Sequence, residues 1–188
     1  MENNKSKKIH TRAFQPIDLA YIGIFSAVIA LCSWISIPTT VPFTLQTLGV
    51  FAALGILGGR RGFFAVFTYL LLGAVGVPVF AGWKGGIAAL LGNTGGYLLG
   101  FLLLAALYWL AESLFGDTLL VKTISMVIGL LVCYAFGTAW FMVLYLKTTG
   151  PVSVASVLGW CVLPFLLPDA LKLAAALFLS SKLKKHVR

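Results

Sequence analysis

Long apolar stretches alternate along this chain with short segments that contain proline, glycine or charge. A helix needs about 17 to 25 mainly apolar residues to cross a hydrocarbon core of about 30 Å. The pattern predicts an all-α integral membrane protein with six transmembrane helices, over residues 19–37, 43–58, 62–80, 95–112, 121–146 and 157–181. The second range contains only 16 residues and needs tilt or local bilayer thinning to cross.

Turn-forming residues separate the predicted helices. Pro38 and Pro42 bracket the turn after the first helix, and GGRRG, AGWKGGIAALLGNTGG and ESLFGD follow the second, third and fourth. We expect a single membrane domain over residues 1–188, with a basic cytoplasmic segment at 1–18 and a basic cytoplasmic tail at 182–188. The first helix is expected to stay in the protein, because it is a full span without an A-x-A type cleavage site.

Composition agrees with a multi-pass membrane protein. The chain has 188 residues, of which 60% are hydrophobic and 10% charged, and its mean hydropathy is +1.01. The net charge of +9 does not indicate a nucleic-acid partner, because the basic residues gather at the chain ends and in one turn, with no soluble domain to carry a phosphate-binding face. The positions of the basic residues instead indicate how the chain is oriented in the membrane.

Cytoplasmic segments of membrane proteins carry an excess of Lys and Arg. If the N-terminus is cytoplasmic, only Lys84 and Lys147 fall on the outer side. Both termini are therefore expected in the cytoplasm. The eleven residues on the inner side are Lys5, Lys7, Lys8, Arg12, Arg60, Arg61, Lys122, Lys182, Lys184, Lys185 and Arg188.

Two kinds of chemistry are not indicated by the sequence. There is no G-x-x-x-x-G-K-[ST] motif, so a second subunit would have to supply nucleotide hydrolysis in any powered transport. Cys32, Cys133 and Cys161 lie singly in three apolar stretches and form no C-x-x-C pattern. We therefore expect neither a disulfide nor a metal site, and no cofactor.

Asp169 and Lys172 are two charges within the last apolar stretch. On insertion scales each costs about 2.5 to 3.5 kcal/mol near the middle of a bilayer, and ionisable residues in membrane spans usually line a cavity or a path. Three positions apart on a helix, the two side chains share a face and can pair while still offering hydrogen bonds to a ligand. The alternative is an ion pair that only orders the helix bundle.

A glycine-rich segment, GVPVFAGWKGGIAALLGNTGGYLLG, joins the third and fourth predicted helices. It has eight glycines in 25 residues, and glycine permits tight turns and close approach of the backbone to a ligand. We interpret it as a lid or pocket wall; an ordinary flexible loop is the alternative, and Trp83 could equally be an interfacial anchor. Its candidate ligand-binding residues are Trp83, Lys84, Asn93, Thr94, Gly95 and Tyr97.

Three segments resemble one known family. PFTLQTLGVFAALGILGGRRG, GVPVFAGWKGGIAALLGNTGGYLLGF and LPDALKLAAAL are similar to BioY, the biotin-binding S component of energy-coupling factor (ECF) transporters, and the resemblance spans roughly residues 20–180. It implies an S-component fold that captures biotin from outside the cell. The family commonly has Pro at the position of Asn93 and Arg or Lys at that of Lys84. The implied partners are a transmembrane coupling protein and two ATP-binding-cassette ATPases.

Biotin suits the polar residues of this chain, because it combines an apolar body with a ureido group and a carboxylate. Asp169 can accept from a ureido N–H, and Lys172 can hold Asp169 and donate to the ureido oxygen. Asn93 or Gln46 can do either. Lys84 is our candidate for the carboxylate, although the two lysines could exchange these roles. The candidate apolar walls are Trp83, Tyr97 and Trp160.

Small residues in the first helix form a second pattern. Gly23 and Ala27 are four positions apart, as are Ser26 and Ala30, and such spacing lets another helix approach closely. S components dock on the coupling protein through an Ala-xxx-Ala motif in this helix. By resemblance, Gly23 and Ala27 are the expected docking residues.

The sequence thus predicts a biotin-binding subunit in a prokaryotic cell membrane, without enzymatic activity. An enzyme is disfavoured because His10 and His186 lie in the tails and Asp169 is the only carboxylate at membrane depth. One alternative is a self-sufficient secondary transporter with a proton-relaying Asp–Lys pair, although no internal repeat is visible. The other is an S component for a different vitamin-like molecule.

Overall fold

A computed structural model describes residues 13–39 and 41–184. Its elements are α1 (Pro16–Trp34), β1 (Ser36–Ile37), β2 (Phe43–Thr44), α2 (Gln46–Leu57), α3 (Gly59–Ala74), α4 (Ile87–Leu91), α5 (Gly95–Phe115), α6 (Leu119–Thr148), α7 (Val154–Cys161) and α8 (Leu163–Leu183). The predicted inner residues Lys5, Lys7, Lys8, Arg12, Lys185 and Arg188 lie outside the described residues.

Each of the six predicted helices overlaps a helix of the structure: α1, α2, α3, α5, α6 or α8. Four helical segments are long and apolar enough to cross a membrane, namely Pro16–Trp34, Gly95–Phe115, Leu119–Thr148 and Val154–Leu183. The two others are shorter, with 12 residues in α2 and 16 in α3. A mostly helical fold is therefore confirmed, and four of its helical segments have the length and composition of membrane spans.

The structure differs from the predicted ranges where proline or glycine acts on the backbone. A short antiparallel hairpin, β1 with β2, replaces the predicted start of the second helix, so α2 begins only at Gln46. The third helix ends at Ala74 rather than residue 80, shortly before Gly76, which has a φ of 105°, and Pro78. The last predicted helix is divided into α7 and α8 at Val162, just before Pro164.

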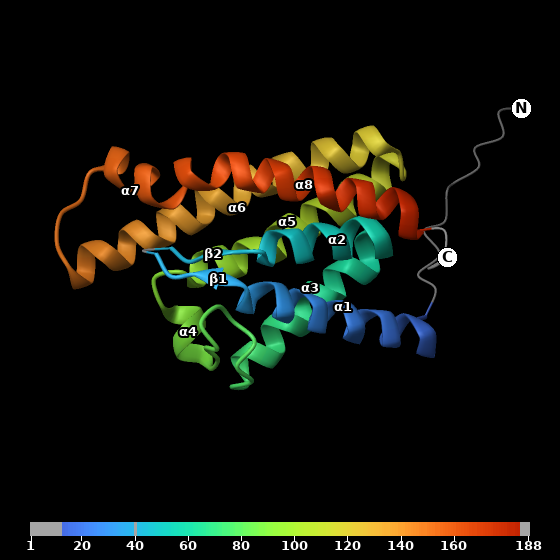
Figure 1. The fold of residues 1–188 in the computed structure, drawn as a ribbon, viewed down its shortest axis with the longest axis horizontal. Coiled ribbons are helices and arrows are strands. Elements are labelled where there is room, and N and C mark those ends of the chain that lie inside the picture. Colours follow the sequence, from blue (N-terminus) through green and yellow to red (C-terminus); the bar gives the residue numbers. More distant parts are fainter. Residues whose placement is uncertain (1–12, 40, 185–188) are drawn as a thin grey trace, which may run out of the picture.

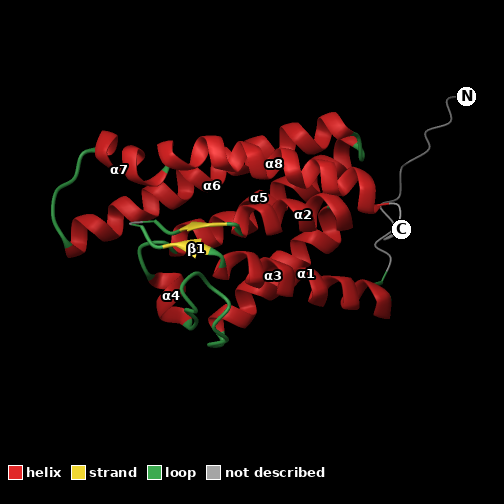
Figure 2. Ribbon diagram, viewed as in Figure 1, coloured by secondary structure: helices red, strands yellow, loops and turns green. Residues whose placement is uncertain are grey.

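Most helices run along the long axis of the molecule (Figure 1). The hairpin and α4 lie toward one end, whereas α1 begins and α8 ends at the opposite end (Figures 1 and 2). α5 packs along α6, α2 against α8, and α1 against both α2 and α3. This arrangement places the glycine-rich segment and the hairpin over the same end of the helix bundle.

Glycine lets α5 and α6 approach closely. A Cβ added at Gly137 would lie 2.2 Å from a ring carbon of Tyr97, and one added at Gly96 would lie 2.3 Å from Cβ of Trp140. Small residues at helix contacts permit such packing where lipid provides no hydrophobic driving force between helices. The contact fixes the first turn of α5, which forms the last part of the glycine-rich segment.

Candidate functional site

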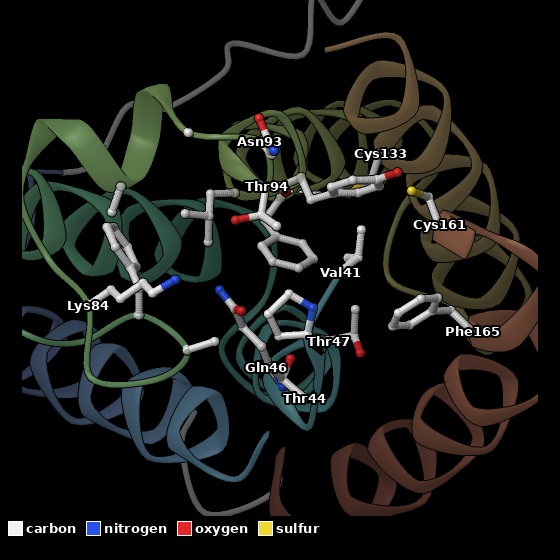
Figure 3. A pocket seen from close by; sticks show the side chains of 18 of the residues that line it. Val41, Thr44, Gln46, Thr47, Lys84, Asn93, Thr94, Cys133, Cys161 and Phe165 are labelled. Atoms are coloured by element: carbon white, nitrogen blue, oxygen red, sulfur yellow. Dashed lines mark hydrogen bonds between the residues drawn. The ribbon is translucent and has the colours of Figure 1, made fainter. Parts of the chain in front are cut away.

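A cavity of about 620 Å³ lies among α2, α5, α6, α8, the hairpin region and the glycine-rich segment. This volume falls within the range of about 300 to 1,000 Å³ typical of small-molecule sites. Apolar walls come from Phe80, Phe101, Leu130 and Phe165, and polar side chains enter between them (Figure 3). The cavity can therefore hold a largely apolar molecule with a few polar groups.

Asp169 is the most enclosed charge in this cavity, with 2% of its surface exposed. Its Oδ1 accepts hydrogen bonds from Thr47 Oγ1 at 2.8 Å and from Lys172 Nζ at 2.7 Å. Its Oδ2 accepts from Tyr134 Oη at 2.5 Å. Donors from α2, α6 and α8 thus meet on one carboxylate, which compensates the cost of burying it.

Lys172 joins this carboxylate to the hairpin. Its ammonium donates to the carbonyl oxygen of Thr44 at 2.7 Å and lies 4.6 Å from the ring centroid of Phe43. An ammonium has three N–H donors, and two of these are used by Asp169 and Thr44. One donor therefore remains for a ligand acceptor.

The Asp169 carboxylate can also accept a further hydrogen bond. An ionised carboxylate offers about four lone-pair sites, and three are used by Thr47, Lys172 and Tyr134. Tyr134 and Thr47 donate their hydroxyl hydrogens to Asp169, so their oxygens face a ligand as acceptors only. The cluster can consequently offer both a cationic donor and several acceptors.

The glycine-rich segment contributes a second polar region. Lys84, Asn93 and Thr94 line the cavity, and the Lys84 side chain extends inward in the direction of Gln46 (Figure 3). Gln46 donates its amide N–H to Tyr69 Oη at 2.8 Å, which leaves its carbonyl oxygen as an acceptor. A single ligand can therefore meet a second cation away from the Asp169 cluster.

Seven of the ten predicted ligand-binding residues line the cavity, and these are Gln46, Lys84, Asn93, Thr94, Tyr97, Asp169 and Lys172. Trp83 does not: it is 62% exposed and stacks on Trp34. Trp160 is 42% exposed and contacts Tyr145 instead. Gly95 supports the turn before α5, where an added Cβ would lie 1.7 Å from the carbonyl oxygen of Leu90.

Sequence reasoning missed Thr47 and Tyr134, the two hydroxyl partners of Asp169. Tyrosine in membrane helices is enriched at the interfaces. Tyr134 instead lies in the middle of α6, where a polar group needs an internal partner. That position was a usable signal, whereas nothing in the sequence distinguishes Thr47 from neighbouring small residues.

Metal ligation is not indicated at this site. Within residues 13–39 and 41–184 there is no cluster of three or more His, Cys, Asp or Glu side chains that could hold a metal ion. Cys133 and Cys161 both line the cavity as free thiols. The charged groups that line the cavity are the Asp169 carboxylate and the ammonium groups of Lys84 and Lys172.

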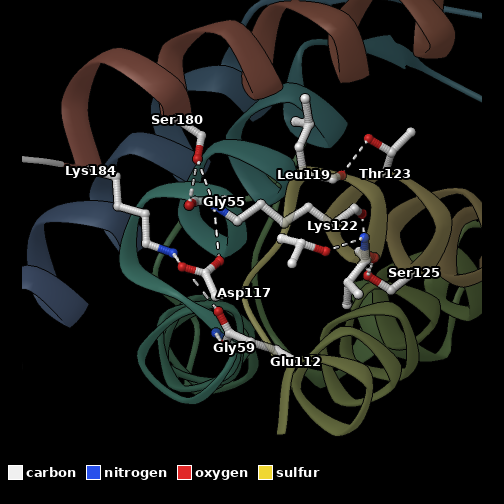
Figure 4. Close-up of polar contacts among 12 residues, drawn as sticks. Gly55, Gly59, Glu112, Asp117, Leu119, Lys122, Thr123, Ser125, Ser180 and Lys184 are labelled. Atoms are coloured by element: carbon white, nitrogen blue, oxygen red, sulfur yellow. Dashed lines mark hydrogen bonds and ion pairs between the residues drawn. The ribbon is translucent and has the colours of Figure 1, made fainter. Parts of the chain in front are cut away.

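A second charged cluster (Figure 4) lies near the end of α8, at the opposite end of the bundle (Figure 1). Asp117 pairs with Lys184 and, at 3.1 Å, with Lys122. Glu112 accepts a hydrogen bond of 2.5 Å from the N–H of Gly59 at the start of α3. Burial raises the pKa of Asp117, but the two ammonium groups more than offset this and hold its pKa below the ordinary 3.8. The cluster joins the α2–α3 turn, the α5–α6 turn and the end of α8.

The predicted docking residues of the first helix are accessible. Gly23 and Ala27 are both exposed on α1, and an added Cβ at Gly23 would meet no atom within 4 Å. Ser26, in contrast, is buried and donates to the carbonyl oxygen of Ala65 in α3 at 2.9 Å. Gly23 and Ala27 thus lie on a face of α1 that is separate from its packing contacts.

Comparison with known proteins gives consistent similarities. Residues 4–188 match the BioY family. The chain is 42% identical over 165 residues to a biotin transporter BioY of Thermotoga maritima, covering 87% of this chain and 93% of that relative. It is 35% identical over 168 residues to a probable biotin transporter BioY of Pyrococcus horikoshii, covering 89% and 96%.

The fold is similar to one solved experimentally. The crystal structure of the S-component for biotin from an ECF-type ABC transporter superposes with a TM-score of 0.74 and 25% sequence identity. The match covers 92% of this chain and 94% of the other.

Proposed function

Because this chain belongs to the BioY family, we propose that it is the membrane subunit of an ECF-type transporter that binds biotin for uptake. The relatives are named as transporters, and the proposed activity is binding and transport without catalysis. The observation that carries the proposal is the buried Asp169 cluster, which lines an apolar cavity large enough for a vitamin.

The ureido group of biotin matches the Asp169 cluster. Its carbonyl oxygen is a strong acceptor, and Lys172 has one N–H left to donate. Its N–H groups need acceptors, which Tyr134 Oη and the remaining lone pair of Asp169 supply. We assign this end of the cavity to the ureido group, with Asn93 and Gln46 as further polar contacts.

The carboxylate of biotin is assigned to Lys84. A ureido group held at Lys172 directs the valeryl chain along the apolar walls toward the glycine-rich segment. Lys84 is the second cation on the cavity lining, and Thr94 lies on the same segment. Tyr97, whose hydroxyl is hydrogen-bonded to Thr138 at 2.9 Å, would supply apolar ring surface.

We further propose that α2 and α3 complete a six-helix membrane domain with both termini in the cytoplasm. The start of α1 and the end of α8 lie at the same end of the bundle (Figure 1). Arg60, Arg61, Lys122, Lys182 and Lys184 fall toward that end, as expected for an inner side, in a prokaryotic cell membrane.

The expected partners are a transmembrane coupling protein and two ATP-binding-cassette ATPases. Gly23 and Ala27 offer an exposed, flat helix face for the coupling protein. The Asp169 cluster lies on other elements, so binding and docking use separate surfaces.

Calorimetric titration of the purified protein with biotin tests the binding function directly. We expect saturable one-site binding, and absence of heat with correctly folded protein would refute it. Uptake into proteoliposomes with and without the ATPase partners tests the transport role. Uptake driven by a proton gradient alone would indicate a self-sufficient secondary transporter.

A further inference from the structure

A strained turn holds Lys84 at the cavity. Residues 81–83 form a tight turn between the bridged residues Phe80 and Lys84, and within it Gly82 and Trp83 have φ values of 70° and 58°. Phe80 N–H closes it by donating to the carbonyl oxygen of Lys84 at 2.9 Å. Positive φ at both residues places them in the left-handed region, which favours glycine or asparagine.

Trp83 is therefore an unusual residue at this position. Within residues 13–39 and 41–184 it is the only non-glycine residue with a positive φ, and bulky side chains rarely adopt this conformation. Its side chain is also 62% exposed, so burial does not explain its presence. Some other contact must hold the ring.

That contact is Trp34, in the last turn of α1. The ring centroids of Trp34 and Trp83 lie 4.1 Å apart with an interplanar angle of 18°, which is a stacked arrangement. Trp34 also donates its indole N–H to the carbonyl oxygen of Pro78 at 2.8 Å. The neighbouring Ser33 donates to the carbonyl oxygen of Val79.

The loop is thus fastened to α1 at two points. Ser33 and Trp34 hold the backbone at 78–79, and the indole stack holds the tip of the turn. Lys84 follows Trp83 directly and lines the cavity. Any rotation of the turn about the stack would move the Lys84 ammonium relative to the cavity.

We infer that the Trp34–Trp83 stack is a clasp that positions Lys84 for the ligand carboxylate and holds residues 75–86 over the cavity. This inference rests on the proposed function, because it assigns the carboxylate to Lys84. Trp83 is then a positioning residue that does not itself contact the ligand. Trp83 can therefore affect ligand binding although its side chain does not line the cavity.

Trp83→Gly is the most informative substitution, because glycine is favoured at this φ and the change removes the whole indole side chain. We expect it to weaken biotin binding about threefold to tenfold, as expected for loss of a stacked aromatic pair. An uncharged biotin amide should lose less affinity. Trp160→Ala removes a comparable exposed indole away from the cavity and is the matched control, expected to bind as the parent does.

A double-mutant cycle tests whether Trp83 affects binding through Lys84. If Trp83 acts through Lys84, Trp83→Gly combined with Lys84→Ala should bind biotin no more weakly than Lys84→Ala alone. Additive losses, equal losses for biotin and its amide, or parental affinity in Trp83→Gly would each overturn the inference.

Hydrogen exchange separates this inference from the proposed function. The amides of Phe80 and Gly86 donate to carbonyl oxygens of Lys84 and Gly73, so the closed loop should protect them. In ligand-free protein, Trp83→Gly should speed exchange across residues 75–86, and unchanged exchange would refute the clasp. A parent protein that binds no biotin would instead refute the proposed function.

Discussion

Tyr134 donates a hydrogen bond of 2.5 Å to Asp169, a residue 35 positions away on a different helix. The bond joins the middle of α6 to α8 across the cavity lining. It complements the ion pair between Asp169 and Lys172, which are both on α8. The orientation of the buried carboxylate is therefore set by the tertiary fold as well as by its own helix.

Replacing Tyr134 with Phe should weaken biotin binding about tenfold or more. A hydrogen bond to a charged group contributes about 1.5 to 3 kcal/mol, and its loss also removes an acceptor from the ureido site. Tyr108→Phe is the matched control, because the buried Tyr108 hydroxyl has no hydrogen-bond partner in the described part of the chain. Calorimetry should find parental affinity in the control; equal losses in both variants would contradict a specific role for Tyr134.

Asp169→Asn and Lys172→Ala should each reduce biotin affinity at least tenfold. Removing one partner of a buried charge pair leaves the other uncompensated, at a cost of about 2 to 5 kcal/mol. Lys182→Ala changes an exposed lysine of the same helix and should bind normally. Unchanged affinity in well-folded variants would exclude the pocket assignment, whereas a folding defect alone would support a purely structural ion pair.

Lys84→Ala should discriminate less than the parent between biotin and an uncharged biotin amide. The parent gains a charge interaction only with the acid, and the variant lacks the ammonium that provides it. Competition binding with the two ligands gives the affinity ratio. Lys147→Ala, an exposed lysine in the last turn of α6, should keep the parental ratio. If Lys84→Ala keeps it too, the carboxylate is held elsewhere, with Lys172 the first candidate.

Gly23→Leu or Ala27→Leu should abolish co-purification with the coupling protein and ATPases while biotin affinity stays within a few-fold. Branched side chains on this exposed face would prevent close helix packing, although the isolated subunit has room for them at Gly23. Ala175→Leu, on an exposed face of α8, is the size-matched control and should assemble normally. Loss of biotin affinity with an intact complex would instead assign α1 to the pocket.

Asp117 should make the fold sensitive to acid. Its folded pKa lies below the ordinary value of 3.8, so its stabilising contribution is complete above about pH 4 and is lost as the pH falls through the lowered value. Asp117→Asn should therefore unfold at a lower temperature than the parent near about pH 6, and the two midpoints should converge as the pH falls through the lowered pKa of Asp117. A difference that stays constant with pH would contradict the ion-pair explanation.

Periodic and local features of the fold could be predicted from the sequence. Six apolar stretches located the main helices, and the spacing of Asp169 and Lys172 predicted the ion pair, which the structure has at 2.7 Å. Features that depend on the path of the backbone could not be predicted. The hairpin that supplies the Thr44 carbonyl to Lys172 is too short to leave a pattern, and α4 lies within a segment dominated by glycine.

The directions in which side chains point also could not be predicted from the sequence. Trp83 and Lys84 are adjacent, and both were assigned to the pocket, yet the positive φ of Trp83 turns its indole toward Trp34 while Lys84 lines the cavity. Thr47 and Tyr134 reach Asp169 only through the packing of α2 and α6 around α8. Such contacts between residues far apart in the sequence leave no local pattern from which they could be predicted.

The pairing of Asp169 with Lys172 within one helix also bears on how this protein is made. A membrane helix that enters the bilayer from the translocon with one unpaired charge meets a cost of about 2.5 to 3.5 kcal/mol. Here the counter-ion lies one turn away on the same segment, at 2.7 Å. The α8 segment can therefore neutralise its own charges during insertion, before Thr47 and Tyr134 arrive from other helices. Moving Lys172 to a neighbouring helix would preserve a cation in the cavity yet leave α8 to insert with a bare carboxylate.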